Sequence, residues 1–166
     1  MSAQANSGLR LSDRPRPDDP VVLWRDVFAV FDDGSYAVRD YASVERRLFE
    51  QQTNFPHGLG CLVVIPTGAK RIQDDVRAEI ERVLNAISVR ALCWTVLEGG
   101  FRGATIRGTL TTLNMLGRRK NYPTRITGGL EEALEWLLPR LDQGASRLRD
   151  MDDALAVFRE RLSPVG

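Results

Sequence analysis

The sequence predicts an α/β protein with a mixed sheet, in the order β-β-α-β-α-β-α-β-α, followed by one appended C-terminal helix. Two observations support this prediction. Apolar runs of strand length alternate with amphipathic stretches of helix length over residues 21–141, which is typical of a sheet backed by helices. Two short runs, GCLVVIP and VRALCWTVL, are almost wholly apolar, as expected for parallel strands buried on both faces.

We expect a hairpin at the start of the sheet, formed by a strand over residues 21–32 and a short strand over residues 35–38. The turn between them is Asp32-Asp33-Gly34-Ser35, and Asp-Gly between apolar runs is a strong hairpin signal. The first two strands are therefore expected to be antiparallel neighbours.

The next three elements follow from changes of hydrophobic period. Residues 41–55 carry apolar side chains near one helical face, and Pro56 ends the helix. Residues 60–66 form a buried strand, and residues 71–88 carry an apolar stripe at helical spacing. Asp74 lies in the first turn of that second helix, where a carboxylate interacts favourably with the helix dipole.

The remaining elements of the sheet repeat this pattern. Residues 89–97 form a strand, residues 98–103 a turn and residues 104–120 a helix. A short strand over residues 124–127 and a helix over residues 130–141 complete the series. We expect right-handed crossovers between the parallel strands.

Composition limits the class of protein and its organisation. The chain has 166 residues, enough for one domain, and a net charge of +1, so we expect no nucleic-acid partner. No stretch approaches the roughly 18 apolar residues of a transmembrane helix, and the N-terminus has no apolar signal core. We expect a cytoplasmic protein with a disordered or loosely attached tail over residues 1–20, an α/β domain over residues 21–141, and an appended amphipathic helix and tail over residues 142–166.

The appended helix has a narrow apolar stripe with two interpretations. The stripe has alternating spacings of three and four and consists of Leu148, Met151, Leu155, Phe158 and Leu162. It either packs on the surface of its own domain or docks onto a second subunit or a partner. In the second case these residues are partner-binding candidates, and docking onto a second subunit would make the chain a homodimer through this helix.

No motif for catalysis, metal binding or a cofactor stands out. Cys61 and Cys93 lie inside apolar runs without C-x-x-C spacing, which indicates buried, reduced thiols. His57 is the one histidine, and the chain has no G-x-S-x-G elbow. We therefore expect a protein that is not an enzyme and that uses no cofactor and no metal.

The order of elements resembles the STAS fold of anti-anti-sigma factors, and more narrowly its bacterial STAS-like relatives. The resemblance covers about residues 21–141 and rests on GCLVVIP, VRALCWTVL, TRITGG and LEEALEWL. It implies a non-enzymatic regulatory domain that docks onto a protein partner, often under the control of phosphorylation. Thr67, with the glycine after it, stands where the family has its phosphoacceptor, although the Asp and adjacent Ser of the family's Asp-Ser-Ser-Gly context are absent.

Two further surfaces are candidates for binding. The turns over residues 66–71, 98–103 and 127–129 should gather at the carboxyl edge of the sheet, where ligands of open α/β sheets bind. Helix starts and basic side chains there would suit a nucleotide, phosphate or lipid, or the turns are ordinary connections; the candidate residues are Thr67, Lys70, Arg71, Glu98 and Arg102. The helix over residues 104–120 is rich in threonine, which indicates either a contact face or hydroxyls bonded to the helix's own carbonyls; its threonines include Thr105, Thr109, Thr111 and Thr112.

Overall fold

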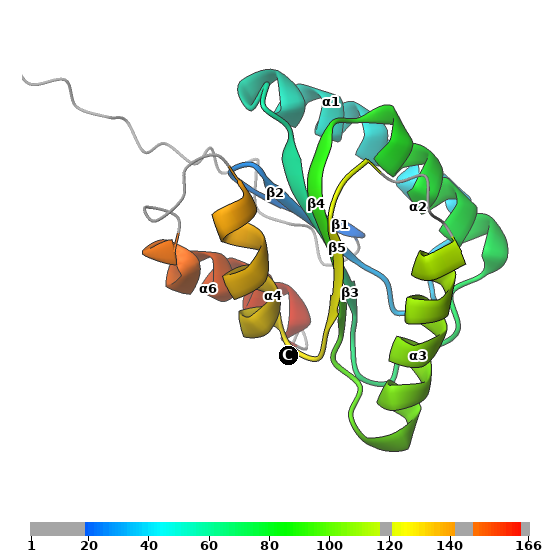
Figure 1. The fold of residues 1–166 in the computed structure, drawn as a ribbon. Coiled ribbons are helices and arrows are strands. Elements are labelled where there is room, and N and C mark those ends of the chain that lie inside the picture. The colour runs from blue at the N-terminus through cyan, green and yellow to red at the C-terminus, as the bar shows by residue number, and fades with distance from the viewer. Residues whose placement is uncertain (1–18, 117–120, 142–147, 164–166) are drawn as a thin grey trace, which may run out of the picture.

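A computed structural model describes residues 19–116, 121–141 and 148–163 of the chain. One five-stranded sheet in the order β1-β2-β3-β4-β5 lies between two layers of helices (Figure 1), so the predicted α/β class is confirmed. The predicted N-terminal tail lies outside the described residues, apart from positions 19 and 20. No helix in the described part of the chain is long and apolar enough to cross a membrane.

The elements follow the predicted order. The strands are β1 (Val21–Trp24), β2 (Val27–Phe31), β3 (Leu59–Ile65), β4 (Val89–Val96) and β5 (Thr124–Thr127). The helices are α1 (Val44–Asn54), α2 (Asp74–Ala86), α3 (Gly100–Leu116), α4 (Leu130–Leu137) and α6 (Met151–Leu162). The described residues also form two short 3-10 helices, η2 (Val38–Tyr41) and η3 (Leu138–Arg140).

The N-terminal hairpin exists, but the prediction placed its turn wrongly. β1 and β2 both lie within the segment predicted as one strand, and they pair antiparallel with Trp24 opposite Val27. The polar pair at residues 25–26 interrupts the apolar run and forms the turn, with Arg25 at a φ of 50°. Residues 32–37 are a loop, and no strand forms over residues 35–38.

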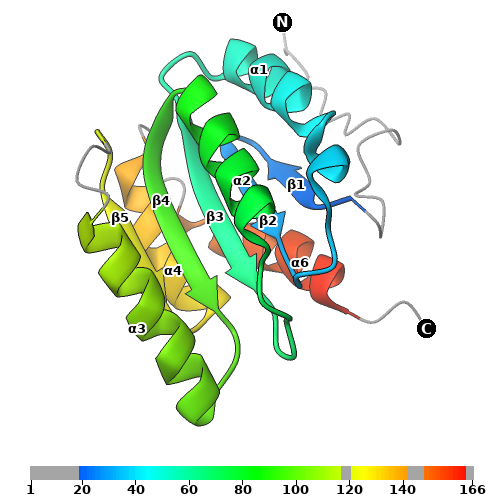
Figure 2. The ribbon, with the colours of Figure 1, turned by 90° about the vertical axis from the view of Figure 1, so that its right-hand side faces the viewer.

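The two faces of the sheet are covered by different helices. α1, α2 and α3 pack on one face, and α4 and α6 pack on the other (Figures 1 and 2). β2, β3, β4 and β5 are parallel, and their order in the sheet follows their order in the chain. Because α1, α2 and α3 connect successive strands in one direction across the sheet, right-handed crossovers place all three on the same face.

Each face of the sheet has its own hydrophobic core. Every residue of β3 is buried, and alternate side chains point to opposite faces. Val63 packs in the first core with Leu48 of α1 and Ile80 of α2. Val64 packs in the second core with Leu134 of α4. The prediction that this strand is covered on both sides is therefore confirmed.

α6 packs its apolar stripe onto its own domain. Leu155 and Phe158 are buried in the second core, and the ring centroid of Phe158 lies 6.4 Å from that of Phe31 in β2. Met151 and Leu162 are partly buried and pack against the same core. These four residues therefore pack on the surface of their own domain, which is the first of the two interpretations of the stripe. Leu148, which precedes the helix, remains 44% exposed.

The position of α6 predicts a large difference between two truncations along the same stripe. Phe158→Ala should lower the free energy of unfolding by about 3–5 kcal/mol, because it leaves a cavity between α6 and the sheet. Leu148→Ala, at the exposed end of the stripe, should change it by no more than about 0.5 kcal/mol. Chemical denaturation of both variants measures the difference. Equal stabilities would contradict the packing of α6 described above.

Candidate functional site

The carboxyl ends of four parallel strands lie at one edge of the sheet. The loops that follow β2, β3, β4 and β5 cover residues 32–37, 66–73, 97–99 and 128–129. The sequence predicted the last three loops at this edge. It missed the loop after β2, because the Asp-Gly pair in that loop was taken for a hairpin turn.

A cavity of about 470 Å³ lies between the loops after β2 and β3 and the C-terminal end of α6. We call it the β2–β3 cavity. Its polar wall consists of Asp33, Ser35, Tyr36, Thr67, Lys70, Arg161 and Ser163. Thr67 and Lys70 were predicted from the sequence, whereas the other five residues were not.

Two neighbouring aspartates in the loop after β2 occupy opposite environments. Asp32 is fully buried and accepts hydrogen bonds from the Tyr41 hydroxyl at 2.9 Å and from the Gly34 amide at 2.7 Å. Burial raises the pKa of its carboxyl despite these two bonds. Asp33 is exposed and accepts from the Ser35 amide at 2.9 Å. Its partial desolvation acts to raise its pKa, but the bonds from Ser35 outweigh that effect and lower it.

The Arg161 guanidinium of α6 is held against the loop after β2. It donates to the Tyr36 hydroxyl at 2.6 Å and to the backbone carbonyl of Asp19 at 3.2 Å. It also lies over the ring of Phe31, 5.7 Å from the ring centroid. These contacts fix a cation at the wall of the cavity.

The loops after β2 and β3 approach each other at Gly34 and Lys70. The Lys70 amide donates to the Asp33 carbonyl at 2.7 Å. Gly34 has a φ of 80°, and a Cβ built there would lie 2.6 Å from the Lys70 carbonyl oxygen. Only glycine therefore fits at this crossing.

The loops after β3 and β4 are cross-linked by the residues predicted for this edge. The Thr67 hydroxyl donates to the Leu97 carbonyl at 3.2 Å, and the Gly68 amide donates to the Glu98 carboxylate at 2.8 Å. Arg102 donates to the Ala69 carbonyl and lies 3.5 Å from the Glu98 carboxylate. Glu98 and Arg102 therefore join two loops and lie outside the lining of the β2–β3 cavity.

Arg71 also lies outside the lining of the cavity. Its side chain is 86% exposed, and its guanidinium lies 3.7 Å from the Asp74 carboxylate at the start of α2. Phosphorylation of Thr67 stays a prediction of the family resemblance. In the structure, the Thr67 hydroxyl donates a hydrogen bond to the Leu97 carbonyl.

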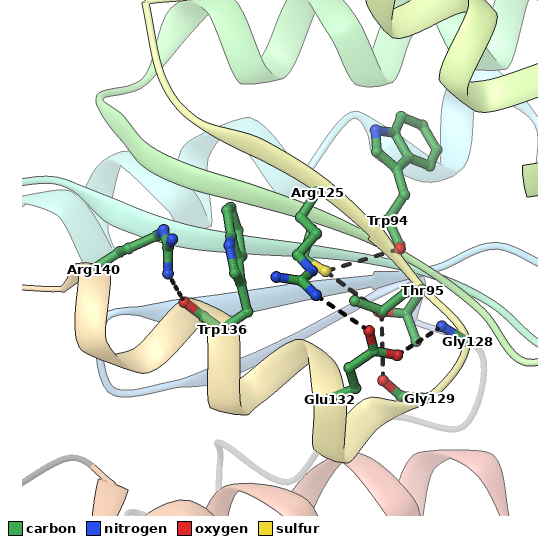
Figure 3. Close-up of polar contacts among 10 residues, drawn as sticks. Trp94, Thr95, Arg125, Gly128, Gly129, Glu132, Trp136 and Arg140 are labelled. Atoms are coloured by element: carbon green, nitrogen blue, oxygen red, sulfur yellow. Dashed lines mark hydrogen bonds and ion pairs between the residues drawn. The ribbon is translucent and has the colours of Figure 1, made fainter.

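A second polar cluster, between β4, β5 and α4, is buried. The Thr95 and Thr127 hydroxyl oxygens lie 3.2 Å apart, and the Cys93 sulfur lies 3.6 Å from the Thr127 oxygen. Nearby, Glu132 accepts from the Gly128 amide at 3.3 Å and lies 3.5 Å from the Arg125 guanidinium (Figure 3). These contacts attach the short strand β5 and the start of α4 to β4.

This cluster has the properties of a structural contact. Cys93 is fully buried, and burial raises the pKa of its thiol despite the hydrogen bonds that it shares with Thr127 and Thr95. The thiol is therefore protonated at neutral pH and a poor nucleophile. Cys61 is likewise a buried thiol. The described residues contain no group of three or more His, Cys, Asp or Glu side chains that could hold a metal ion.

The outer face of α3 is the second notable surface. Phe101 lies in the first turn and is 89% exposed. Ile106 and Leu110 are partly buried and pack against the first core, whereas Thr105 and Thr109 are exposed. The threonine hydroxyls bond to the carbonyls four residues earlier, as in Thr105 to Phe101 at 3.0 Å and Thr109 to Thr105 at 3.1 Å.

Comparisons with known proteins identify no relative of this chain. No protein-family model, curated protein or solved structure matches the chain.

The two aspartates of the loop after β2 should contribute to stability with opposite dependence on pH. Because the folded-state pKa of Asp32 is raised above 3.8, its contribution grows as pH falls through the folded pKa toward the unfolded value. Because the pKa of Asp33 is lowered below 3.8, its contribution is present above the unfolded value and is lost as pH falls through the folded pKa.

Urea denaturation between pH 3 and 7 of wild type, Asp32→Asn and Asp33→Asn tests these signs. The stability of wild type relative to Asp32→Asn should rise toward low pH, and its stability relative to Asp33→Asn should fall. The same sign for both variants would rule out the environments assigned to the two carboxyls.

Proposed function

We propose that this protein is a non-enzymatic regulatory or scaffold module that binds another protein through the outer face of α3. One observation is the main support. Phe101 is 89% exposed at the start of this face, whereas the next most exposed large apolar side chain in the described residues, Phe49, is 45% exposed. Exposure of an aromatic ring to water is unfavourable, and a partner that covers the ring removes this free-energy cost.

The face behind Phe101 carries almost no charge. The exposed residues between positions 101 and 112 are Phe101, Arg102, Ala104, Thr105, Gly108, Thr109, Thr111 and Thr112. Arg102 is the one charged residue in this set, and its guanidinium turns toward Ala69 and Glu98. The outer faces of other helices differ, since α2 exposes Glu81 and Arg82. Charged residues are depleted at the centre of protein interfaces, as they are here.

The threonines lower the desolvation cost of burying this face against a partner. Their hydroxyls already donate to carbonyls of the same helix, including Thr111 to Arg107 at 2.9 Å and Thr112 to Gly108 at 3.1 Å. A partner that removes water from the face therefore leaves no hydroxyl donor without an acceptor. A Cβ built on Gly108 would point into open space, so a partner helix could approach closely there.

The proposed partner is a protein with an uncharged, apolar surface and a pocket for the Phe101 ring. The resemblance to bacterial STAS-like regulatory proteins supports a protein as the ligand. The C-terminal helix is not part of the proposal, because Leu155 and Phe158 are used in the core of the same domain. Control through Thr67 belongs to the proposal as an expectation of the same resemblance. A cytoplasmic location belongs to it as an expectation from the sequence.

We propose no catalytic activity because the potentially reactive side chains lie far from one another or are buried. The thiol of Cys93 is buried and protonated. His57 precedes β3, so it lies at the amino edge of the sheet, opposite the β2–β3 cavity. These groups do not meet at one site.

Phe101→Glu should weaken binding of the partner by more than about tenfold, because it replaces the aromatic ring that fills the partner's pocket with a charge. The free energy of unfolding should stay within about 0.5 kcal/mol of wild type, since the side chain is exposed. Phe49→Glu, which adds the same charge to the outer face of α1, is the matched control.

Quantitative pull-down from the native host compares the three proteins, and light scattering over a concentration series reports whether the partner is a second copy of the chain. Loss of one stoichiometric partner, or of self-association, in Phe101→Glu alone supports the proposal. Equal capture and equal mass for wild type and both variants would refute it.

A further inference from the structure

We infer that the β2–β3 cavity binds a small anion that carries hydroxyl groups, such as a phosphorylated or carboxylated polyol. This site is separate from the outer face of α3 and does not depend on the function proposed for it.

The charges on the cavity wall favour an anion. Two cationic side chains, Lys70 and Arg161, and one carboxylate, Asp33, line the cavity. Among the residues that the structure describes, none makes an ion pair with the Lys70 ammonium at the cavity. An ammonium and a guanidinium at one small cavity can together bind a phosphate or a carboxylate.

The same wall can hold hydroxyl groups of the ligand. Asp33 uses its Oδ1 atom to accept from the Ser35 amide and hydroxyl, and no other residue that the structure describes donates a hydrogen bond to its Oδ2 atom. This carboxylate oxygen can accept from a ligand hydroxyl. A carboxylate beside two cations therefore favours an anion that also carries hydroxyl donors over a bare anion, because a ligand hydroxyl can donate to the Asp33 oxygen that would otherwise only repel the ligand's charge.

The site is largely organised before binding. Arg161 is fixed by Tyr36, by the Asp19 carbonyl and by the ring of Phe31. The loop that carries Lys70 is fixed by its backbone bond to Asp33. Groups that are already held in place lose little conformational entropy when a ligand binds.

The volume and the apolar part of the lining of the cavity fit a small molecule. Its volume is about 470 Å³, within the range of about 300–1,000 Å³ that is usual for ligand pockets. Apolar side chains, including Phe31, Pro66 and Leu162, line the remainder. They can contact the carbon skeleton of a polyol while its charged end contacts Lys70 and Arg161.

Glycerol 3-phosphate, glycerate and neutral glycerol, at matched ionic strength, are suitable probes. Thermal unfolding and amide chemical shifts of the full chain report binding and its location. Because a ligand that binds only the native state stabilises it, one or both anions should raise Tm with a saturable dose response and shift the amides of Gly34, Gly68 and Lys70. Glycerol should do neither. The two anions distinguish phosphate from carboxylate as the preferred group.

Lys70→Gln removes one cation from the cavity wall, and Arg71→Gln removes the adjacent charge, which lies outside the lining. Lys70→Gln should weaken binding of the anions by about tenfold or more, and Arg71→Gln should bind as wild type does. Phe101→Glu should also bind normally, so this test and that of the α3 face can fail separately.

Two results would overturn the inference. The first is the absence of any saturable response of wild type to either anion. The second is equal binding by Lys70→Gln and Arg71→Gln, which would indicate an unspecific effect of charge.

Discussion

The burial of the central strands on both faces is the constraint on which the rest of the structure depends. All seven residues of β3 are buried, and so are six of the eight in β4. Such strands are stable only if apolar side chains cover each face of the sheet. α1, α2 and α3 cover the first face. α4 has only eight residues, and α6 completes the cover of the second face with Leu155 and Phe158.

This use of α6 decides where the surfaces of the protein lie. Because Phe158 packs next to Phe31, the C-terminal end of the helix reaches the loop after β2 and brings Arg161 to Tyr36. The β2–β3 cavity exists because of that approach. α3 packs on the first core through partly buried residues, Ile106 and Leu110, and leaves its other side exposed.

The cavity and the outer face of α3 share one connecting segment. The loop after β3 carries Lys70 at the cavity and, next to it, the Ala69 carbonyl that accepts from Arg102 of α3. Arg102 is adjacent in sequence to Phe101. Glu98 and Thr67 strengthen the same junction through their bonds across the two loops. Both surfaces are therefore built on one hydrogen-bonded framework at the carboxyl edge of the sheet.

The sequence alone determined the class of fold, the order of its elements and two residues of the cavity, Thr67 and Lys70. These follow from local signals: the period of apolar residues distinguishes strands from helices, and the turn after a buried strand lies at the carboxyl edge of the sheet. It also indicated the threonine-rich helix, although Phe101 was placed in the preceding turn and its exposure was not anticipated.

Only the tertiary structure decided the position of the hairpin turn, the role of Asp32 and Asp33, and the placement of Arg161. The Asp-Gly pair is compatible with a hairpin and equally with the loop that the structure has, where Asp32 accepts from the Gly34 amide. An apolar stripe on a helix specifies that the stripe is covered, but not by which surface. Arg161 joins the cavity through the packing of α6 across the sheet, a contact between residues far apart in the chain that no local pattern encodes.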